Sequence, residues 1–168
     1  MIPYSWIDVA LLALLMVATT TDLTRGKVPN LLNFSFLGLG IGLNALTTGW
    51  GVGLVGCVAA FGLMFPGWKL NAVRGGDAKL LMAVGAIAGP SDAIRACLLT
   101  YILNLPFGLI VLIARRRLGN LAAVVRSQIG GLLGRPTGEI PEVTRVAFVP
   151  VIAAAVLVTR TTEVLLWW

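Results

Sequence analysis

The sequence predicts an all-α, polytopic membrane protein. Apolar residues make up 58% of its 168 residues, only 12% are charged, and the apolar residues gather in six long segments. A soluble domain averages about 25% charged residues. We therefore expect one integral-membrane domain over residues 1–168, with no room for a separate soluble domain.

Each of the six apolar segments is expected to cross the bilayer as a helix. A span needs about 20 residues, with a range of roughly 17–25. The fourth segment is short because Pro90 closes it, so either it extends back through Gly75 and Gly76 or the protein is thin there. The segments are Ile2–Thr21, Leu31–Thr47, Gly51–Trp68, Ala78–Gly89, Ala93–Ala114 and Val146–Thr159.

The basic residues predict the orientation of these spans. Eleven of the thirteen Lys and Arg lie between segments one and two, three and four, or five and six. The positive-inside rule makes these connections cytoplasmic, so both termini face the non-cytoplasmic side. The longest connection, about 115–145, is then a cytoplasmic loop in which Leu118–Leu133 forms either an interfacial amphipathic helix or a plain connection. The net charge of +6 reflects this topology and contact with anionic lipid, and no nucleic-acid partner is expected.

Two pairs of glycines predict where helices pack closely. Gly38 with Gly42 and Gly49 with Gly53 have the four-residue spacing that lets two helix backbones approach each other. We expect tight packing within the bundle at both pairs.

The residues that are missing exclude several kinds of enzyme. Histidine is absent, which excludes HExxH zinc proteases and hydrolases that use a Ser-His pair. The two cysteines, Cys57 and Cys97, lie in separate apolar segments and form no CxxC pair, so neither a zinc site nor a disulfide framework is predicted. Acid–base chemistry must then come from carboxylates, Lys, Tyr or Cys, and no metal or cofactor is expected.

Two carboxylates, Asp22 and Asp77, lie at the cytoplasmic ends of apolar segments. Segment one runs inward and ends at Asp22, and segment four begins directly after Asp77. Ionisable groups at membrane depth are functional candidates. Two neighbouring carboxylates share a proton, so that one accepts a proton from water while the other protonates a carbonyl. Asp22 and Asp77 are therefore the predicted catalytic pair for hydrolysis of a peptide bond.

The residues around Asp77 are expected to support this pair. Gly75 and Gly76 are predicted to form an active-site loop that a substrate strand can approach closely. Lys79 either tunes the local electric field or extends its charge to the interface. A structural interpretation stays open for each acid: Asp77 as a helix N-cap, and Asp22 as the partner of Arg25 or Lys27.

Three stretches carry a resemblance to a known family. Asp22–Asn30 has an acid followed by basic residues and a Val-Pro-Asn sequence, Gly76–Leu81 has the second acid, and Ala147–Ala153 has a proline near the start of the last helix. These stretches resemble the GxGD-type intramembrane aspartic proteases, specifically the prepilin peptidases, also called type IV leader peptidases. The resemblance implies supporting roles toward motif or substrate for Lys27, Pro29 and Asn30. The pattern departs at Arg74, where the family has glycine, and we expect this cation to alter the loop or the substrate preference.

The resemblance implies a function as well as a fold. Such an enzyme sits in the cytoplasmic (inner) membrane and removes a short basic leader from prepilins or pseudopilins at the cytoplasmic face. The absence of a CxxC-bearing insertion implies the short, peptidase-only branch without methyltransferase activity, similar to the enzymes of tight-adherence (Flp) pilus systems. Archaeal preflagellin peptidases are similar too. Two other classes stay open: a non-catalytic scaffold of a pilus or secretion assembly, and a proton-coupled transporter, whose acids would lie near the midplane.

Overall fold

The computed structural model of the chain describes residues 5–69, 73–114 and 148–166. The described residues confirm the all-α prediction. They form six helices, which are α1 (Ser5–Arg25), α2 (Asn30–Thr47), α3 (Trp50–Lys69), α4 (Gly75–Ala88), α5 (Pro90–Ala114) and α7 (Val149–Leu166). The predicted cytoplasmic loop at about 115–145, with its Leu118–Leu133 segment, lies outside the described residues.

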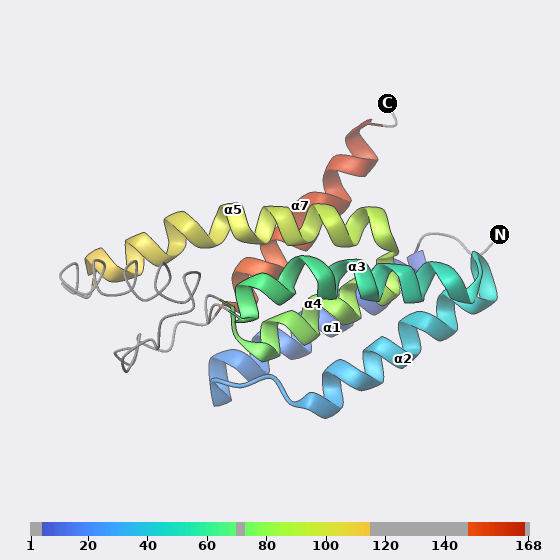
Figure 1. Cartoon of the computed structure of the whole chain (residues 1–168), viewed down its shortest axis with the longest axis horizontal. Coiled ribbons are helices and arrows are strands. Elements are labelled where there is room, and N and C mark those ends of the chain that lie inside the picture. Colours follow the sequence, from blue (N-terminus) through green and yellow to red (C-terminus); the bar gives the residue numbers. More distant parts are fainter. Residues whose placement is uncertain (1–4, 70–72, 115–147, 167–168) are drawn as a thin grey trace.

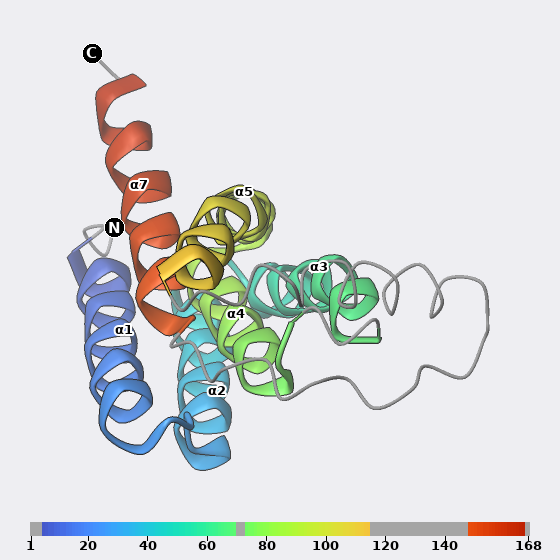
Figure 2. The same cartoon turned by 90° about the vertical axis from the view of Figure 1, so that its left-hand side faces the viewer.

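Helix α4 forms the centre of the bundle. Helices α1 to α5 alternate in direction, and α7 begins at the same end as α4 (Figure 1). Figure 2 shows α4 surrounded by the other helices, and it contacts all five of them. Its side chains supply much of the apolar core, because Leu80, Leu81, Val84 and Ile87 are all fully buried. The shortest of the described helices is thus also the most enclosed.

Proline and glycine decide where the central helix ends. Helix α4 stops at Ala88 because Gly89 has a φ of +90°, a conformation that glycine adopts without steric cost. Pro90 then begins α5, where its missing N–H is not needed for a helical hydrogen bond. At its other end α4 begins at Gly75. The fourth apolar segment therefore extends back through the two glycines, which is one of the two predicted alternatives.

The closest helix contact joins the backbones of α3 and α4. A Cβ atom added at Gly56 would overlap the carbonyl oxygen of Gly85, and one added at Gly85 would overlap the carbonyl oxygen of Gly56. Gly40 makes a similar contact from α2, because a Cβ there would lie 2.7 Å from the backbone of α4. These glycines let α2 and α3 approach the central helix more closely than any side chain would allow.

The predicted glycine pairs are largely wrong. A Cβ at Gly38, Gly42 or Gly49 would meet no atom within 4 Å, whereas one at Gly53 would lie 3.0 Å from the carbonyl oxygen of Ala86. A four-residue spacing identifies small residues on one face of a helix. It does not say whether that face meets a neighbour, and on α2 the contacting face is the one that carries Gly40.

Asn44 of α2 caps the end of α4 that the proline leaves open. The carbonyl of Ala86 would accept a hydrogen bond from residue 90, but Pro90 has no N–H. The buried Asn44 replaces that donor, since its Nδ2 donates to the carbonyl oxygens of Ala86 at 2.9 Å and Ile87 at 3.0 Å. The hydroxyl of Thr48 donates in turn to Oδ1 of Asn44 at 2.7 Å.

A charged cluster joins three helices at the opposite end of the bundle from Asp22. Arg160 of α7 donates from Nε to Oδ1 of Asp8 at 2.9 Å, and from NH1 to Oδ2 of Asp92 at 2.7 Å. Asp8 lies in the first turn of α1 and Asp92 in the first turn of α5. The two carboxylates and the guanidinium thereby connect α7 to α1 and α5. Their charges are paired within this cluster, which is separate from Asp22 and Asp77.

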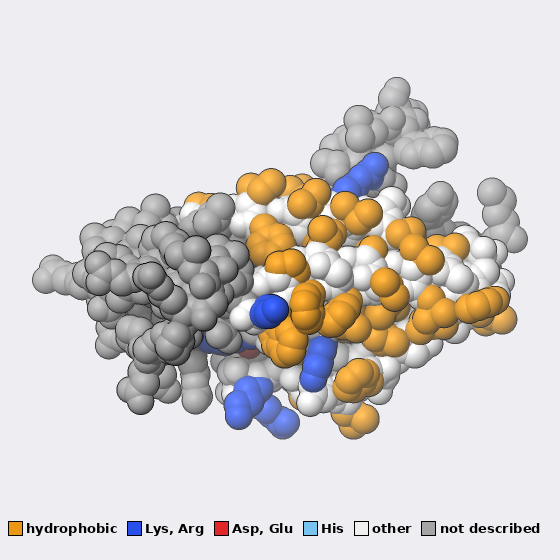
Figure 3. All heavy atoms as spheres, viewed as in Figure 1, with side chains coloured by type: hydrophobic (Ala, Val, Ile, Leu, Met, Phe, Trp, Pro, Cys, Tyr) orange, Lys and Arg blue, Asp and Glu red, His pale blue; other side chains and the backbone are white. Residues whose placement is uncertain are grey.

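The surface of the described helices is apolar over large areas. Two helical stretches, Trp6–Arg25 and Trp50–Lys69, are long and apolar enough to cross a membrane. Leu31 and Leu46 of α2 are each 79% exposed, and in Figure 3 apolar side chains cover most of the described surface, with basic side chains mainly in its lower part. So much exposed apolar surface suits lipid better than water. The six spans and the side of each terminus stay predictions.

We predict that Gly56→Ala will destabilise the bundle. The added methyl group overlaps the carbonyl oxygen of Gly85, so the α3–α4 contact must widen, at a cost of about 1–3 kcal/mol. Thermal unfolding of the purified protein in detergent measures the change. Gly62→Ala on the same helix is the matched control, because a Cβ at Gly62 would meet no atom within 4 Å. Equal melting temperatures for the two variants would contradict the close contact.

Asn44→Leu should also destabilise the bundle, because it leaves two carbonyl oxygens of α4 without their donor. The expected loss is about 1–3 kcal/mol, measured by the same unfolding experiment. Thr47→Val, one turn away on α2, also removes a side-chain hydrogen bond, but one to its own helix at Leu43. This control should stay close to the parent protein.

Candidate active site

Asp22 lies in the last turn of α1 and faces the start of α7. Its side chain is buried, with 6% of the residue exposed. Its Oδ2 accepts a hydrogen bond at 3.4 Å from the backbone N–H of Val149, the first residue of α7. A helix N-terminus carries partial positive charge and favours an anion. This contact offsets the unfavourable position of Asp22 at the C-terminus of α1.

The predicted ion pair of Asp22 with a nearby cation is not found. Neither Arg25 nor Lys27 bridges to Asp22 among the described ion pairs, which join Arg160 to Asp8 and Asp92. Lys27 is exposed. The backbone carbonyl of Asp22 accepts instead from the N–H of Gly26 at 2.8 Å, which closes α1 through a residue with a φ of +63°.

Asp77 is the third residue of α4 and is also buried, with 8% exposed. The predicted N-cap role is wrong, because the extended residue before the helix is Arg74. The carboxylate of Asp77 nevertheless reaches back to the backbone N–H of Arg74, an arrangement known from capping boxes. Asp77 therefore satisfies one of the backbone donors that the helix start leaves free.

The structure brings the two acids into each other's electric field. Among the described residues, the charged groups that act on Asp77 are Asp22 and Arg74. Helices α1 and α4, which carry the two acids, are in contact. The charge of Asp22 therefore acts on a second buried carboxylate, at the start of α4.

The two glycines before Asp77 are helical, so the predicted active-site loop is wrong for them. Both belong to the first turn of α4, and neither has a positive φ. A Cβ at Gly75 would lie 3.3 Å from Nε1 of Trp68, whereas a Cβ at Gly76 would meet no atom within 4 Å. Trp68 at the end of α3 thus limits the size of residue 75, and the space beside Gly76 is open.

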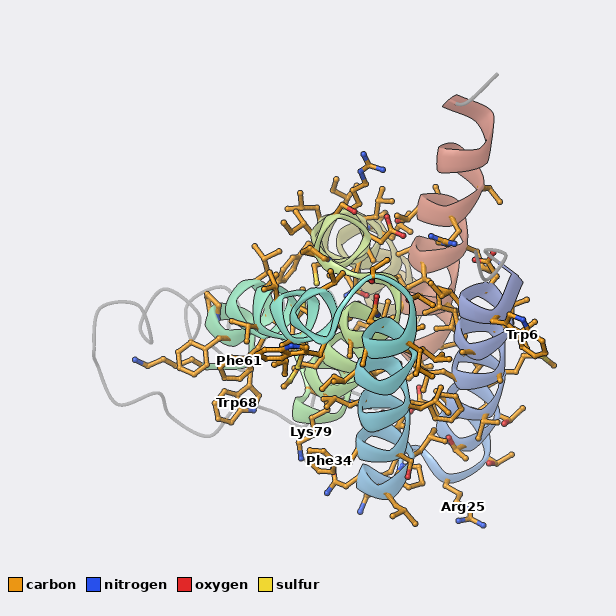
Figure 4. All side chains as sticks on the ribbon, turned by 90° about the vertical axis from the view of Figure 1, so that its right-hand side faces the viewer. Trp6, Arg25, Phe34, Phe61, Trp68 and Lys79 are labelled. Carbon is orange, nitrogen blue, oxygen red and sulfur yellow. The ribbon has the colours of Figure 1, made fainter. Side chains whose placement is uncertain are left out.

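Lys79 connects the two aspartate-bearing stretches. Its Nζ donates to Oδ1 of Asn30 at 3.0 Å and lies 5.6 Å from the centre of the Phe34 ring. Figure 4 shows Lys79 and Phe34 side by side. The field-tuning role of Lys79 stays a prediction. Pro29 is the extended N-cap of α2, directly before Asn30.

Asn33 is a residue at this site that the sequence reasoning missed. It is 1% exposed, its Nδ2 donates at 3.5 Å to the carbonyl oxygen of Gly76, and its Oδ1 is buried with no hydrogen-bond partner among the described residues. It therefore ties α2 to the residue before Asp77. The available signal was an asparagine within an apolar segment, where a polar side chain usually has a specific role.

The described residues contain no group of three or more His, Cys, Asp or Glu that could hold a metal ion. Cys57 and Cys97 are both buried and free.

A model of the type IV leader peptidase family matches residues 9–113 of the chain. The chain belongs to the type IV leader peptidase family. The matched region runs from α1 into α5 and contains both Asp22 and Asp77, while α7 and the Ala147–Ala153 stretch lie beyond it. No curated protein and no solved structure matches the chain.

Family membership confirms the resemblance found in the sequence and gives the chain the general function of a leader peptidase. Two helices in the described part of this leader peptidase are apolar enough to span a membrane, which together with the family indicates a membrane location. Its carboxylate pair lies where α1 meets α4, with α7 and α2 touching the same region through Val149 and Asn33. Four helices therefore contribute to the surroundings of the two acids.

Proposed function

We propose that the chain is an intramembrane aspartic endopeptidase that removes the basic leader from prepilins or pseudopilins at the cytoplasmic face of the membrane. The observation that supports the proposal is the burial of both Asp22 and Asp77 together with the action of the Asp22 charge on Asp77. Burying two like-charged groups that interact lowers the stability of the folded protein, so such a pair is expected to have a function.

The proposed reaction uses one proton shared by the two carboxyl groups. The ionised carboxylate takes a proton from water, and the water oxygen attacks the scissile carbonyl carbon while the other carboxyl protonates the carbonyl oxygen. The tetrahedral intermediate then returns its hydroxyl proton to the second acid. The C–N bond breaks as the first acid protonates the leaving amine, and the pair again holds one proton.

The basic leader and the apolar helix of a prepilin suit this site. The leader would stay on the cytoplasmic side, the apolar helix would lie in the bilayer against the bundle, and the scissile bond would reach the interface beside Asp22 and Asp77. We propose six spans with both termini on the non-cytoplasmic side, in the cytoplasmic membrane. With only two cysteines and no CxxC, we assign the chain to the peptidase-only branch, as in tight-adherence (Flp) systems.

A non-catalytic scaffold is the second candidate, and a specific observation favours it. Each acid also has a structural partner, because Asp22 accepts from the N–H of Val149 and Asp77 reaches the N–H of Arg74. In a scaffold these hydrogen bonds would be the only roles of the two carboxylates. An experiment that removes the proton and retains the shape separates the candidates.

We predict that Asp22→Asn and Asp77→Asn will each abolish leader removal. Asparagine retains an oxygen that accepts the same hydrogen bond, but it cannot exchange the shared proton. Leader removal from a co-expressed Flp-type prepilin, followed on a gel, should fall at least 100-fold, on the order of an acid–base contribution. Glu163→Gln, which removes a carboxylate near the far end of α7, is the matched control and should process normally. Normal processing by either aspartate variant would rule out the pair mechanism.

A cysteine scan along α2 should confirm the proposed orientation. After replacement of the two buried cysteines by alanine, Lys27→Cys and Thr47→Cys introduce exposed thiols before and at the end of α2. We expect an impermeant maleimide to label Thr47→Cys in intact cells and Lys27→Cys only after the membrane is opened. The reverse pattern would put the two acids on the outer side and contradict the proposed site of cleavage.

A further inference from the structure

Arg74 is the residue at which this chain departs from the glycine pattern of the resembled proteases, and the structure gives its side chain two neighbours. Its backbone carbonyl accepts from the N–H groups of Asp77 and Ala78, each at 3.1 Å. Any residue in this extended conformation would make those bonds. The side chain therefore needs an explanation of its own.

The first neighbour of the Arg74 side chain is Phe148. The guanidinium carbon Cζ lies 5.7 Å from the centre of the Phe148 ring, within the range of a cation–π interaction. Both residues are partly buried. Phe148 directly precedes α7, and the next residue, Val149, donates its N–H to Asp22. The start of α7 therefore contacts Asp22 through its backbone and Arg74 through its ring.

The second neighbour is Asp77, which follows Arg74 in the first turn of α4, donates its backbone N–H to the carbonyl oxygen of Arg74 at 3.1 Å, and is reached by the charge of the guanidinium. The only other charged group acting on Asp77 among the described residues is Asp22, from α1, and it acts in the opposite sense. Lys79, on the same helix as Asp77, donates to Asn30 instead, and Asn33 of α2 is neutral. Arg74 is thus the cation named among the described charges that act on Asp77, where it opposes the charge of Asp22.

A fixed cation beside a carboxylate pair favours its ionised form. A pair that works with one shared proton loses activity at low pH when it takes up a second proton. A nearby guanidinium opposes that second proton, so activity persists to lower pH. Without the guanidinium the second proton is taken up at higher pH, and the acidic limb of the pH–rate profile moves upward.

We propose that Arg74 is a positioning and electrostatic residue that keeps the Asp22–Asp77 pair singly protonated, and that Phe148 holds the Arg74 guanidinium beside Asp77. This inference rests on the proposed peptidase function. In this proposal, Phe148 at the start of α7 contributes to the reaction by holding the Arg74 guanidinium at the N-terminus of α4.

The test is the pH–rate profile of leader removal by the purified full-length protein in detergent, with a Flp-type prepilin as substrate. In Arg74→Gln the midpoint of the acidic limb should rise by about half a pH unit or more, since an opposite charge at close range shifts carboxyl titration by this order. Arg74→Lys, which retains the charge, should have a midpoint between those of Arg74→Gln and the parent protein. Phe148→Leu should shift the midpoint in the same direction as Arg74→Gln, by less.

A matched control and a double variant sharpen the test. Phe34→Leu removes a ring that makes the same kind of contact with Lys79, and it should leave the midpoint unchanged. Phe148→Leu added to Arg74→Gln should cause no additional shift, because the ring acts through the guanidinium. An unchanged midpoint in Arg74→Gln, or additive shifts in the double variant, would overturn the proposal. If Arg74→Gln fails to fold, Arg74→Lys and Phe148→Leu decide it by the same criteria.

The outcomes also separate this inference from the proposed function. If Asp22→Asn and Asp77→Asn are inactive but the Arg74 variants keep the parent midpoint, the peptidase mechanism stands and the role of Arg74 fails. If the aspartate variants process the prepilin normally, the peptidase mechanism itself fails.

Discussion

The backbone contact between α3 and α4 at Gly56 and Gly85 is the constraint on which the arrangement of the other helices depends. It lets a helix of 14 residues sit in the centre of the bundle, touched by all five of its described neighbours. A central helix enclosed so tightly cannot shift or rotate without breaking many packed contacts. The position of Asp77, in the first turn of that helix, is therefore determined by contacts along its whole length.

The two ends of α4 are held by different means. At the end near Pro90, the amide of Asn44 supplies the donors that proline cannot provide. At the Asp77 end, the carboxylate of Asp77 reaches the backbone N–H of Arg74, the carbonyl of Arg74 accepts from the first turn, and the amide of Asn33 donates to the carbonyl of Gly76. The functional end is thus held in part by its own proposed catalytic group. A role in holding the helix and a role in hydrolysis are compatible, because both need a carboxylate fixed in one place.

The start of α7 adds a third support, from far along the chain. Val149 donates to Asp22, and Phe148 lies against Arg74 beside Asp77. The matched family region ends at residue 113, so the start of α7 contacts Asp22 and Arg74 from outside that region. The charged cluster of Arg160 with Asp8 and Asp92 secures the other half of α7 to α1 and α5. The helix is thus attached to the bundle at its start and again at Arg160.

The sequence by itself determined the all-α class, the approximate extent of the six apolar segments, the two acids and the family. These follow from composition, apolar runs and short motifs, which are local properties. Only the tertiary structure decided that Gly40, Gly56 and Gly85, and neither Gly38 nor Gly42, make the close contacts. It also decided that Asp22 meets the N-terminus of α7, that Asn33 reaches Gly76, and that Arg74 lies on Phe148. Each of these contacts joins residues that are distant in sequence, and no local pattern encodes which faces of two helices will meet.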